Sequence, residues 1–114
     1  MSLLQDLTAL LEPLGYPLET GIFHGKAPDA YLVITPMTEE FEYFSDDSPG
    51  ADVHEARISV YSKSNYEAMK DLLVGALLQA GLLITQRQFI GYEPDTGYYH
   101  YSIDVKKHYY LSEV

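Results

Sequence analysis

The last strand-like segment of the chain carries His100, Ser102 and Asp104, three side chains that together could form a hydrolytic triad. On a β-strand, residues that share a face lie about 6.5–7 Å apart at Cα. A working triad needs contacts of about 2.6–3.2 Å, and its members usually come from separate elements. The sequence also has no GxSxG motif. We therefore expect a polar outer face on a half-solvated strand, and no catalytic residue.

Histidines and acids could also bind a metal ion. The four histidines (His24, His54, His100 and His108) show neither the i, i+4 helical spacing nor a tight HxH motif. The acidic run "DDSPGAD" lacks the D-x-[DN]-x-[DN]-G spacing and the closing Glu of a calcium loop. No glycine pattern typical of a phosphate site is present. We expect no metal site and no cofactor.

The segment "MTEEFEYFSDDSPGADVHEAR", from Met37 to Arg57, holds seven carboxylates with aromatic residues among them. Acidic runs are often solvated faces that also protect sheet edges from aggregation. Aromatic side chains are costly to leave in water, however, and aromatics among acids are typical of a docking surface. Both interpretations stay open. The candidate interaction surface comprises Glu39, Glu40, Phe41, Glu42, Tyr43, Phe44, Asp46 and Asp47.

The periodicity of the chain predicts the elements that position these residues. Apolar residues at spacings of three and four predict one helix over Ser2–Leu14 and a second between a Ser64 cap and Gly81. Alternating or β-branched runs predict strands at 19–24, 30–35, 39–44, 53–62, 82–92 and 98–111. We therefore expect an α+β fold of order α-β-β-β-β-α-β-β. Its sheet should be mainly antiparallel, with four to six strands and both helices packed on one face.

Length and composition indicate one soluble domain over residues 1–114. Of these residues 46% are hydrophobic and 21% charged, which is typical of a globular chain. There is no cysteine, no membrane-spanning run and no basic segment of a signal peptide. The net charge is −10, and Lys26 is the only basic residue before Arg57. Such a surface disfavours binding to free nucleic acid and to acidic lipid membranes.

Several motifs, in their order along the chain, resemble a known family. They are "LLQDLTALLEPLGYPLETGIF", "PDAYLVITPMTEEFEYFSDD", "EARISVYSKSN", "YEAMKDLLVGALLQAG" and "EPDTGYYHYSIDV". Together they span nearly the whole chain. The sequence resembles the small tail-completion, or tail-terminator, proteins (minor tail proteins) of tailed bacteriophages and prophages.

The resemblance implies a non-enzymatic α+β subunit that self-associates into a ring, typically a hexamer, on the tail tube. Its partners would be the tail-tube protein and a head-completion or connector protein. The resemblance also implies assembly in the bacterial host cytoplasm and a final place in the virion tail or neck. The acidic segment would then either line a lumen that DNA must pass without adhering, or contact a neighbouring subunit.

A second class of function is compatible with the charge. An acidic DNA-mimic or inhibitor protein binds a basic enzyme surface, but needs carboxylates in regular rows over much of its surface. Here eleven of the 17 acidic residues precede Arg57, and the rest of the chain is neutral. This uneven distribution favours the tail protein over the mimic.

Overall fold

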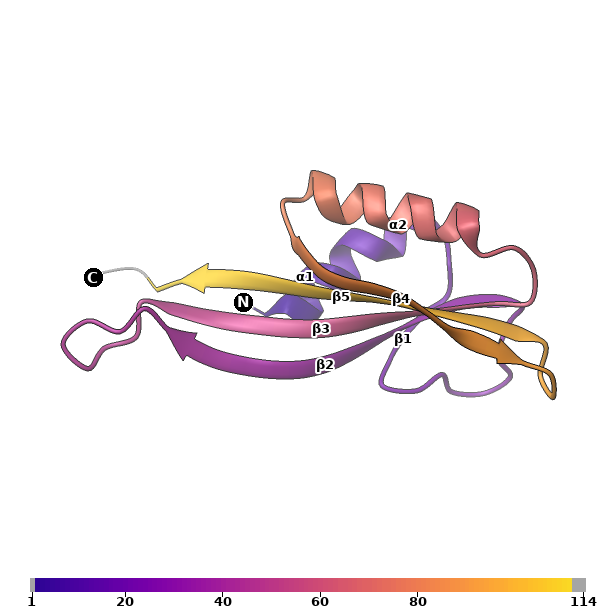
Figure 1. Ribbon diagram of the computed structural model, residues 1–114, viewed down its shortest axis with the longest axis horizontal. Coiled ribbons are helices and arrows are strands. Elements are labelled where there is room, and N and C mark those ends of the chain that lie inside the picture. The colour runs from indigo at the N-terminus through magenta and orange to yellow at the C-terminus, as the bar shows by residue number, and fades with distance from the viewer. Residues whose placement is uncertain (1, 112–114) are drawn as a thin grey trace.

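The computed structural model describes residues 2–111 (Figure 1). Met1 and residues 112–114, which the single-domain prediction includes, lie outside the described residues. The elements are α1 (Leu3–Leu11), the 3₁₀-helix η1 (Glu12–Leu14), β1 (Leu18–Thr20), β2 (Ala30–Glu42), β3 (Ala51–Ser62), α2 (Glu67–Gln79), β4 (Leu83–Glu93) and β5 (Tyr98–Tyr110). The strands form one sheet of order β1-β2-β3-β5-β4. Only the β1–β2 pair is parallel.

Both helices cover the same face of the sheet (Figure 1). The side chain of Ser2, where the predicted first helix begins, accepts a 3.1 Å hydrogen bond from the backbone N–H of Gln5 and so caps α1. Buried residues recur at every fourth position of each helix and pack on one side of the sheet. They are Leu3, Leu7 and Leu11 of α1 and Met69, Leu73 and Leu77 of α2, which meet Leu32, Ile34, Ile58, Val60, Ile103 and Val105. This layer is the hydrophobic core.

The predicted fold class is confirmed, with one strand fewer than expected. The predicted strands at 30–35 and 39–44 form a single strand, β2, that runs past Pro36. The β2–β3 register shifts between Pro36 and Thr38, so Met37 forms a bulge. A bulge at the edge of a sheet accommodates a proline without ending the strand. The observed order is therefore α-β-β-β-α-β-β.

The start of α2 also differs from the prediction. Ser64 does not cap this helix; Tyr66 holds the N-cap position and makes no capping bond with its side chain. The Asn65 side chain instead accepts a 2.9 Å hydrogen bond from the backbone N–H of Glu67. Neither helix within residues 2–111 is long and apolar enough to cross a membrane.

The face of the sheet opposite the helices carries an aromatic cluster. The Tyr31 ring stacks on Tyr61 at 4.7 Å, and Tyr61 stacks on His100 at 4.3 Å. The loop between β1 and β2 contacts this cluster, since Phe23 packs 4.8 Å from Tyr31 and the Tyr98 hydroxyl donates to the Pro28 carbonyl at 2.6 Å. Burial raises the pKa of Tyr31 to about 12. This part of the face is therefore covered.

The molecule is elongated, with extents of 54 × 24 × 24 Å. The far end of the β2–β3 hairpin extends beyond both helices, beside the end of β5 (Figure 1). We call residues 39–52 the arm.

Candidate functional site

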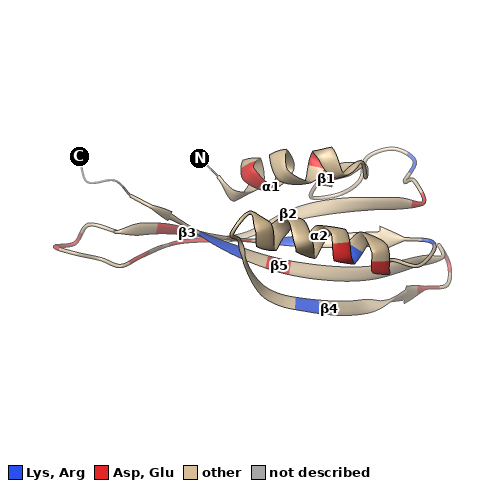
Figure 2. Cartoon of the chain, turned by 90° about the horizontal axis from the view of Figure 1, so that it is seen from above, with Lys and Arg blue, Asp and Glu red and all other residues tan. Residues whose placement is uncertain are grey.

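The arm contains every residue of the predicted interaction surface. In Figure 2, acidic residues follow it towards its tip, away from the helices. Apart from half-buried Glu42, the eight residues are exposed. Phe41, Tyr43 and Phe44 expose 56%, 60% and 63% of their surface. The structure therefore brings the predicted residues together on one projecting element.

The tip of the arm has a defined backbone despite its exposure. Ser45 and Ser48 exchange two backbone hydrogen bonds of 2.8 and 2.9 Å. Tyr43, Asp46 and Asp47 adopt positive φ values of 59°, 51° and 63°, which is uncommon for residues other than glycine. A Cβ atom on Gly50 would lie 2.5 Å from the Tyr43 carbonyl oxygen, so only glycine fits there. The tip is therefore a turn with one defined backbone conformation.

The positive φ of Tyr43 turns its side chain back along the arm. Its ring stacks on His108 at 5.9 Å and on Tyr110 at 6.5 Å. His108 pairs with Val53 on β3, whereas Phe41 pairs with Asp52, whose carboxylate contacts His54 on the helix side. Regular strand alternation would place Phe41 and Tyr43 on one face, but here they lie on opposite faces of the arm. The two faces of the arm each present aromatic surface.

Helix α1 holds the base of the arm. The backbone N–H of Leu3 donates to Nδ1 of His54 at 3.3 Å. Asp6 accepts hydrogen bonds from the Tyr109 hydroxyl and from Lys107, the latter at 2.9 Å. These two bonds, the one from Tyr109 first, lower the pKa of Asp6. The arm therefore projects from a base that is attached to the folded body.

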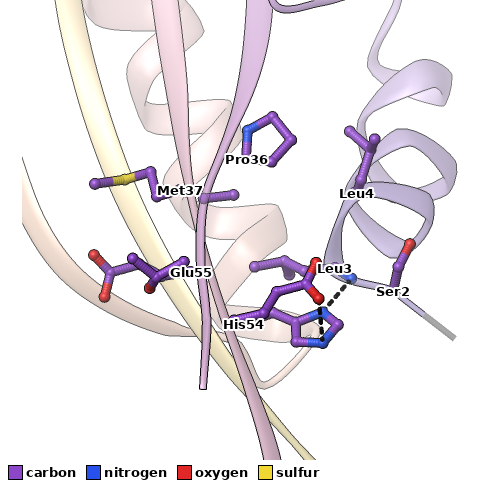
Figure 3. Close-up of a pocket in the computed structure, with 10 residues that line it drawn as sticks. Ser2, Leu3, Leu4, Pro36, Met37, His54 and Glu55 are labelled. Carbon is purple, nitrogen blue, oxygen red and sulfur yellow. Dashed lines mark hydrogen bonds and ion pairs between the residues drawn. The ribbon is translucent and has the colours of Figure 1, made fainter.

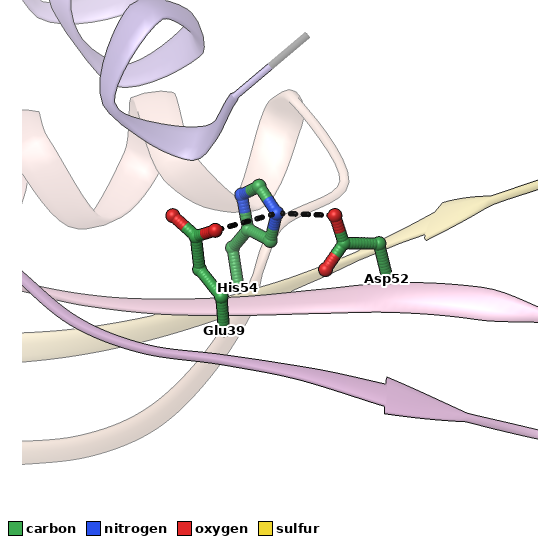
Figure 4. A group of neighbouring side chains, drawn as sticks. All are labelled: Glu39, Asp52 and His54. Atoms are coloured by element: carbon green, nitrogen blue, oxygen red, sulfur yellow. Dashed lines mark ion pairs between the residues drawn. The ribbon is translucent and has the colours of Figure 1, made fainter. Parts of the chain in front are cut away.

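Glu39, Asp52 and His54 form a cluster that sequence reasoning missed (Figure 4). Nε2 of the buried His54 lies 3.0 Å from Asp52 and 3.9 Å from Glu39. Asp52 and His54 alternate on one strand, so the D-x-H spacing is the signal that could have placed them on one face. Glu39 belongs to β2, and the pairing of β2 with β3 places it directly opposite His54.

The hydrogen bonding of His54 determines which chemistry this cluster can do. Because Nδ1 accepts a hydrogen bond from Leu3, the proton of a neutral imidazole resides on Nε2. Nε2 is within ion-pair distance of Asp52 but is not aligned as a hydrogen bond. A metal ion at Nε2 would displace that proton and turn Nδ1 into a donor facing the Leu3 N–H. The cluster therefore favours a neutral histidine whose Nε2–H faces the two carboxylates over a metal ligand.

A small cavity of about 170 Å³ lies between the start of α1 and the base of the arm (Figure 3). Leu3, Leu4, Pro36 and Met37 form part of its wall, and His54 lies beside them. Sites for small molecules usually have volumes of about 300–1,000 Å³. This cavity is a gap at the junction of the arm, below the size of a cofactor site.

The His100, Ser102 and Asp104 trio does not form a triad geometry. Both Asp104 carboxylate oxygens accept hydrogen bonds from Arg57, at 2.8 and 3.1 Å, so they do not orient an imidazole. The His100 ring stacks on Tyr61, and burial lowers its pKa. The prediction of a half-solvated face is wrong at Ser102 and Asp104, which are 3% and 5% exposed.

Comparisons with known proteins give a likeness to solved structures but none to a family model or a curated protein. Among solved structures, the fold is similar to that of a chain in a structure titled "Virion of native gene transfer agent (GTA) particle". The TM-score is 0.51 at 16% sequence identity, and the match covers 92% of this chain and 89% of the other. At this identity, the likeness shows that the two chains share a fold.

Proposed function

We propose that this protein is a structural subunit of a phage or prophage virion, without enzymatic activity. It forms a ring, typically of six copies, that caps the tail tube and helps to join the tail to the head. Its partners are then further copies of itself, the tail-tube protein and a head-completion or connector protein. It assembles in the cytoplasm of the bacterial host and remains in the tail or neck of the virion.

The observation that carries this proposal is the arm. Phe41 and Phe44 are more than half exposed on an element that projects beyond the helices. Burying an aromatic side chain of this size contributes about 1.5–3 kcal/mol relative to leaving it in water. The arm has a defined backbone at its tip, is held at its base by α1 and exposes aromatic side chains. Such an element is suited to docking on the surface of a partner protein.

The fold likeness supports a place for the arm in a virion. A virion is built by contacts between many protein chains, and the similar chain belongs to such a particle. The match extends over most of both chains, so the likeness concerns the fold as a whole and not a single motif.

The charge supports a position beside passing DNA. The whole net charge of −10 resides in the half of the sequence that includes the arm. Six copies would surround a channel with negative charge, which repels the phosphate backbone and prevents adhesion.

Sedimentation velocity over a wide concentration range, with and without the tail-tube protein of the same genome, tests the proposal. The informative variant replaces residues 43–50 with Asn-Gly, because Glu42 and Ala51 are direct partners and a two-residue turn can join them. The control is Ile22→Ser, which changes a side chain that is 67% exposed outside the arm.

We expect the wild type and the Ile22→Ser variant to form rings or to bind tube protein, and the shortened arm to do neither. The proposal fails if the wild type stays monomeric at all concentrations and also ignores the tube protein.

A further inference from the structure

Charges without ion-pair partners include a group of acids on the arm and one arginine on β4. Within residues 2–111, five of the seven basic residues make ion pairs with acids, and Arg87 and Lys26 make none. Four acids of the arm are likewise without an ion-pair partner in this part of the chain: Glu40, Glu42, Asp46 and Asp47. The arm thus carries unpaired negative charge, and β4 carries an unpaired guanidinium.

Arg87 lies beside exposed aromatic rings. The register places Arg87 opposite Ile103 and Phe89 opposite Tyr101, and Ile103 and Tyr101 belong to the core under the helices. Cross-strand partners share a face, so Arg87 and Phe89 lie on the helix side of β4. The patch comprises Arg87 with Tyr66, Phe89, Tyr92 and Tyr99.

The rings of the patch are organised yet open. Phe89 stacks on Tyr66 at 5.8 Å, and Tyr92 packs on Tyr99 at 4.7 Å. Phe89, Tyr92 and Tyr99 are nevertheless 47%, 49% and 37% exposed. Exposed aromatics that are grouped and flanked by an arginine have the composition of a protein–protein contact.

The patch lies on an outer strand, away from the arm. Strand β4 is the last strand of the sheet order, so its outer edge pairs with no other strand among residues 2–111. Arg87 pairs with Ile103 in the middle of β5, whereas Ala51 of the arm pairs with Tyr110 at the end of β5. In Figure 2 the acidic arm accordingly projects from one end of the molecule, away from β4. The arm of a copy therefore cannot reach its own patch, whereas it can reach that of a neighbour.

We propose that the arm of one copy docks on the Arg87 patch of the next copy. The inference rests on the proposed function and names the two surfaces that meet in the ring. Phe41 and Phe44 contact the exposed rings, while the unpaired acids of the arm face Arg87. Glu93 at the end of β4 and Asp95 in the β4–β5 turn repel the arm, so the arm approaches along the Arg87 side of the patch. A contact between two different surfaces is head-to-tail, and it forms a ring if the rotation closes.

A charge swap tests this contact. Arg87→Glu removes the attraction at the patch, and the double variant Glu40→Arg with Glu42→Arg removes it at the arm. Lys26→Glu is the matched control, because it makes the same charge change at the other unpaired base. We expect Arg87→Glu and the arm variant each to weaken self-association, alone or on tube ends, on the order of tenfold. Lys26→Glu should have no comparable effect.

Mixing the two defective proteins distinguishes this contact from others. In an equimolar mixture of the patch variant and the arm variant, each arm finds a patch of opposite charge, so association should recover. A contact between two arms would respond to the arm variant alone, and a contact between two patches to Arg87→Glu alone.

Two results overturn the inference: equal effects of Arg87→Glu and Lys26→Glu, or no recovery on mixing. If Arg87→Glu still forms rings and caps tubes as the wild type does, the contact is wrong while the proposed function stands. If the wild type neither associates nor binds tube ends, the proposed function fails, and this contact fails with it. Unchanged melting curves show that each variant is folded.

Discussion

Arg57→Ala is the substitution whose effect on stability the structure defines best. Arg57 donates two hydrogen bonds to Asp104, from Nε at 2.8 Å and from Nη2 at 3.1 Å. The Asp104 side chain is only 7% exposed, and the Arg57 side chain is 42% exposed. The pair lies on the sheet face opposite the helices, since its neighbours in sequence point into the core. The substitution leaves a buried carboxylate without its two donors.

The magnitude follows from this unequal burial. Breaking a fully buried pair by removing one partner costs about 3–5 kcal/mol, whereas an exposed pair contributes about 0–1 kcal/mol. Because Arg57 is half exposed, water can enter and replace part of its hydrogen bonding to Asp104. We therefore expect a loss of about 2–3 kcal/mol in the free energy of unfolding. For a chain of this length, each kcal/mol lowers Tm by about 4 °C, so the expected fall is about 8–12 °C.

Urea denaturation of Arg57→Ala, Asp104→Ala and the double variant measures the pair directly. The double-mutant cycle should give a coupling free energy of at least about 1 kcal/mol, because the residues are in direct contact. Replacing both residues with leucine should recover much of the lost stability, since an apolar pair leaves no buried charge. A loss below about 0.5 kcal/mol for Arg57→Ala, or a coupling near zero, would refute the reasoning.

Two further predictions concern the arm and its base. Asp6→Asn should lower stability by about 1 kcal/mol at neutral pH, discounted for the partial exposure of its pair with Lys107. Because the pKa of Asp6 is lowered in the folded state, the stability it contributes is present above the ordinary carboxyl pKa of 3.8 and is lost as pH falls through the folded value. Urea midpoints of wild type and variant should therefore converge in acid; a constant difference would contradict this. Gly50→Ala should destabilise by about 1–3 kcal/mol, because its Cβ would press on the Tyr43 carbonyl oxygen at 2.5 Å. The control Gly75→Ala meets nothing within 4 Å in a helix and should stabilise by about 0.5–1 kcal/mol; equal melting temperatures for the two variants would be the contrary result.

The general architecture could be predicted because it depends on local signals. Leucines at helical spacing after Ser2 predict α1, and Gly15, with φ of 92°, ends the helical segment after Pro13 as expected. Alternation along β3 and β5 predicts paired strands with one face in the core. These patterns involve neighbours in sequence, and nothing in the tertiary structure overrides them.

The departures arise where distant residues decide the local outcome. Pro36 usually indicates the end of a strand, but pairing with β3 on one side and a bulge at Met37 carry β2 onward. Asp104 was expected on a half-solvated face and is instead buried by Arg57, 47 residues away in sequence. No alternation pattern contains that information.

The candidate surface could be predicted as a set of residues, but not as a shape. The acids and aromatics of the arm are evident in the sequence, whereas the turn of Tyr43 towards His108 depends on a positive φ. The His54 cluster was missed because its members come from two strands whose register is set by long-range pairing.

Electron microscopy of tail tubes assembled with and without the protein shows directly whether it caps the tube ends and limits tube length. The proposed function predicts short tubes that carry a ring at one end when wild type is present, and long uncapped tubes with the variant that lacks residues 43–50. Tubes of unchanged length and bare ends in the presence of wild-type protein would contradict the proposal that the arm builds a tail-capping ring.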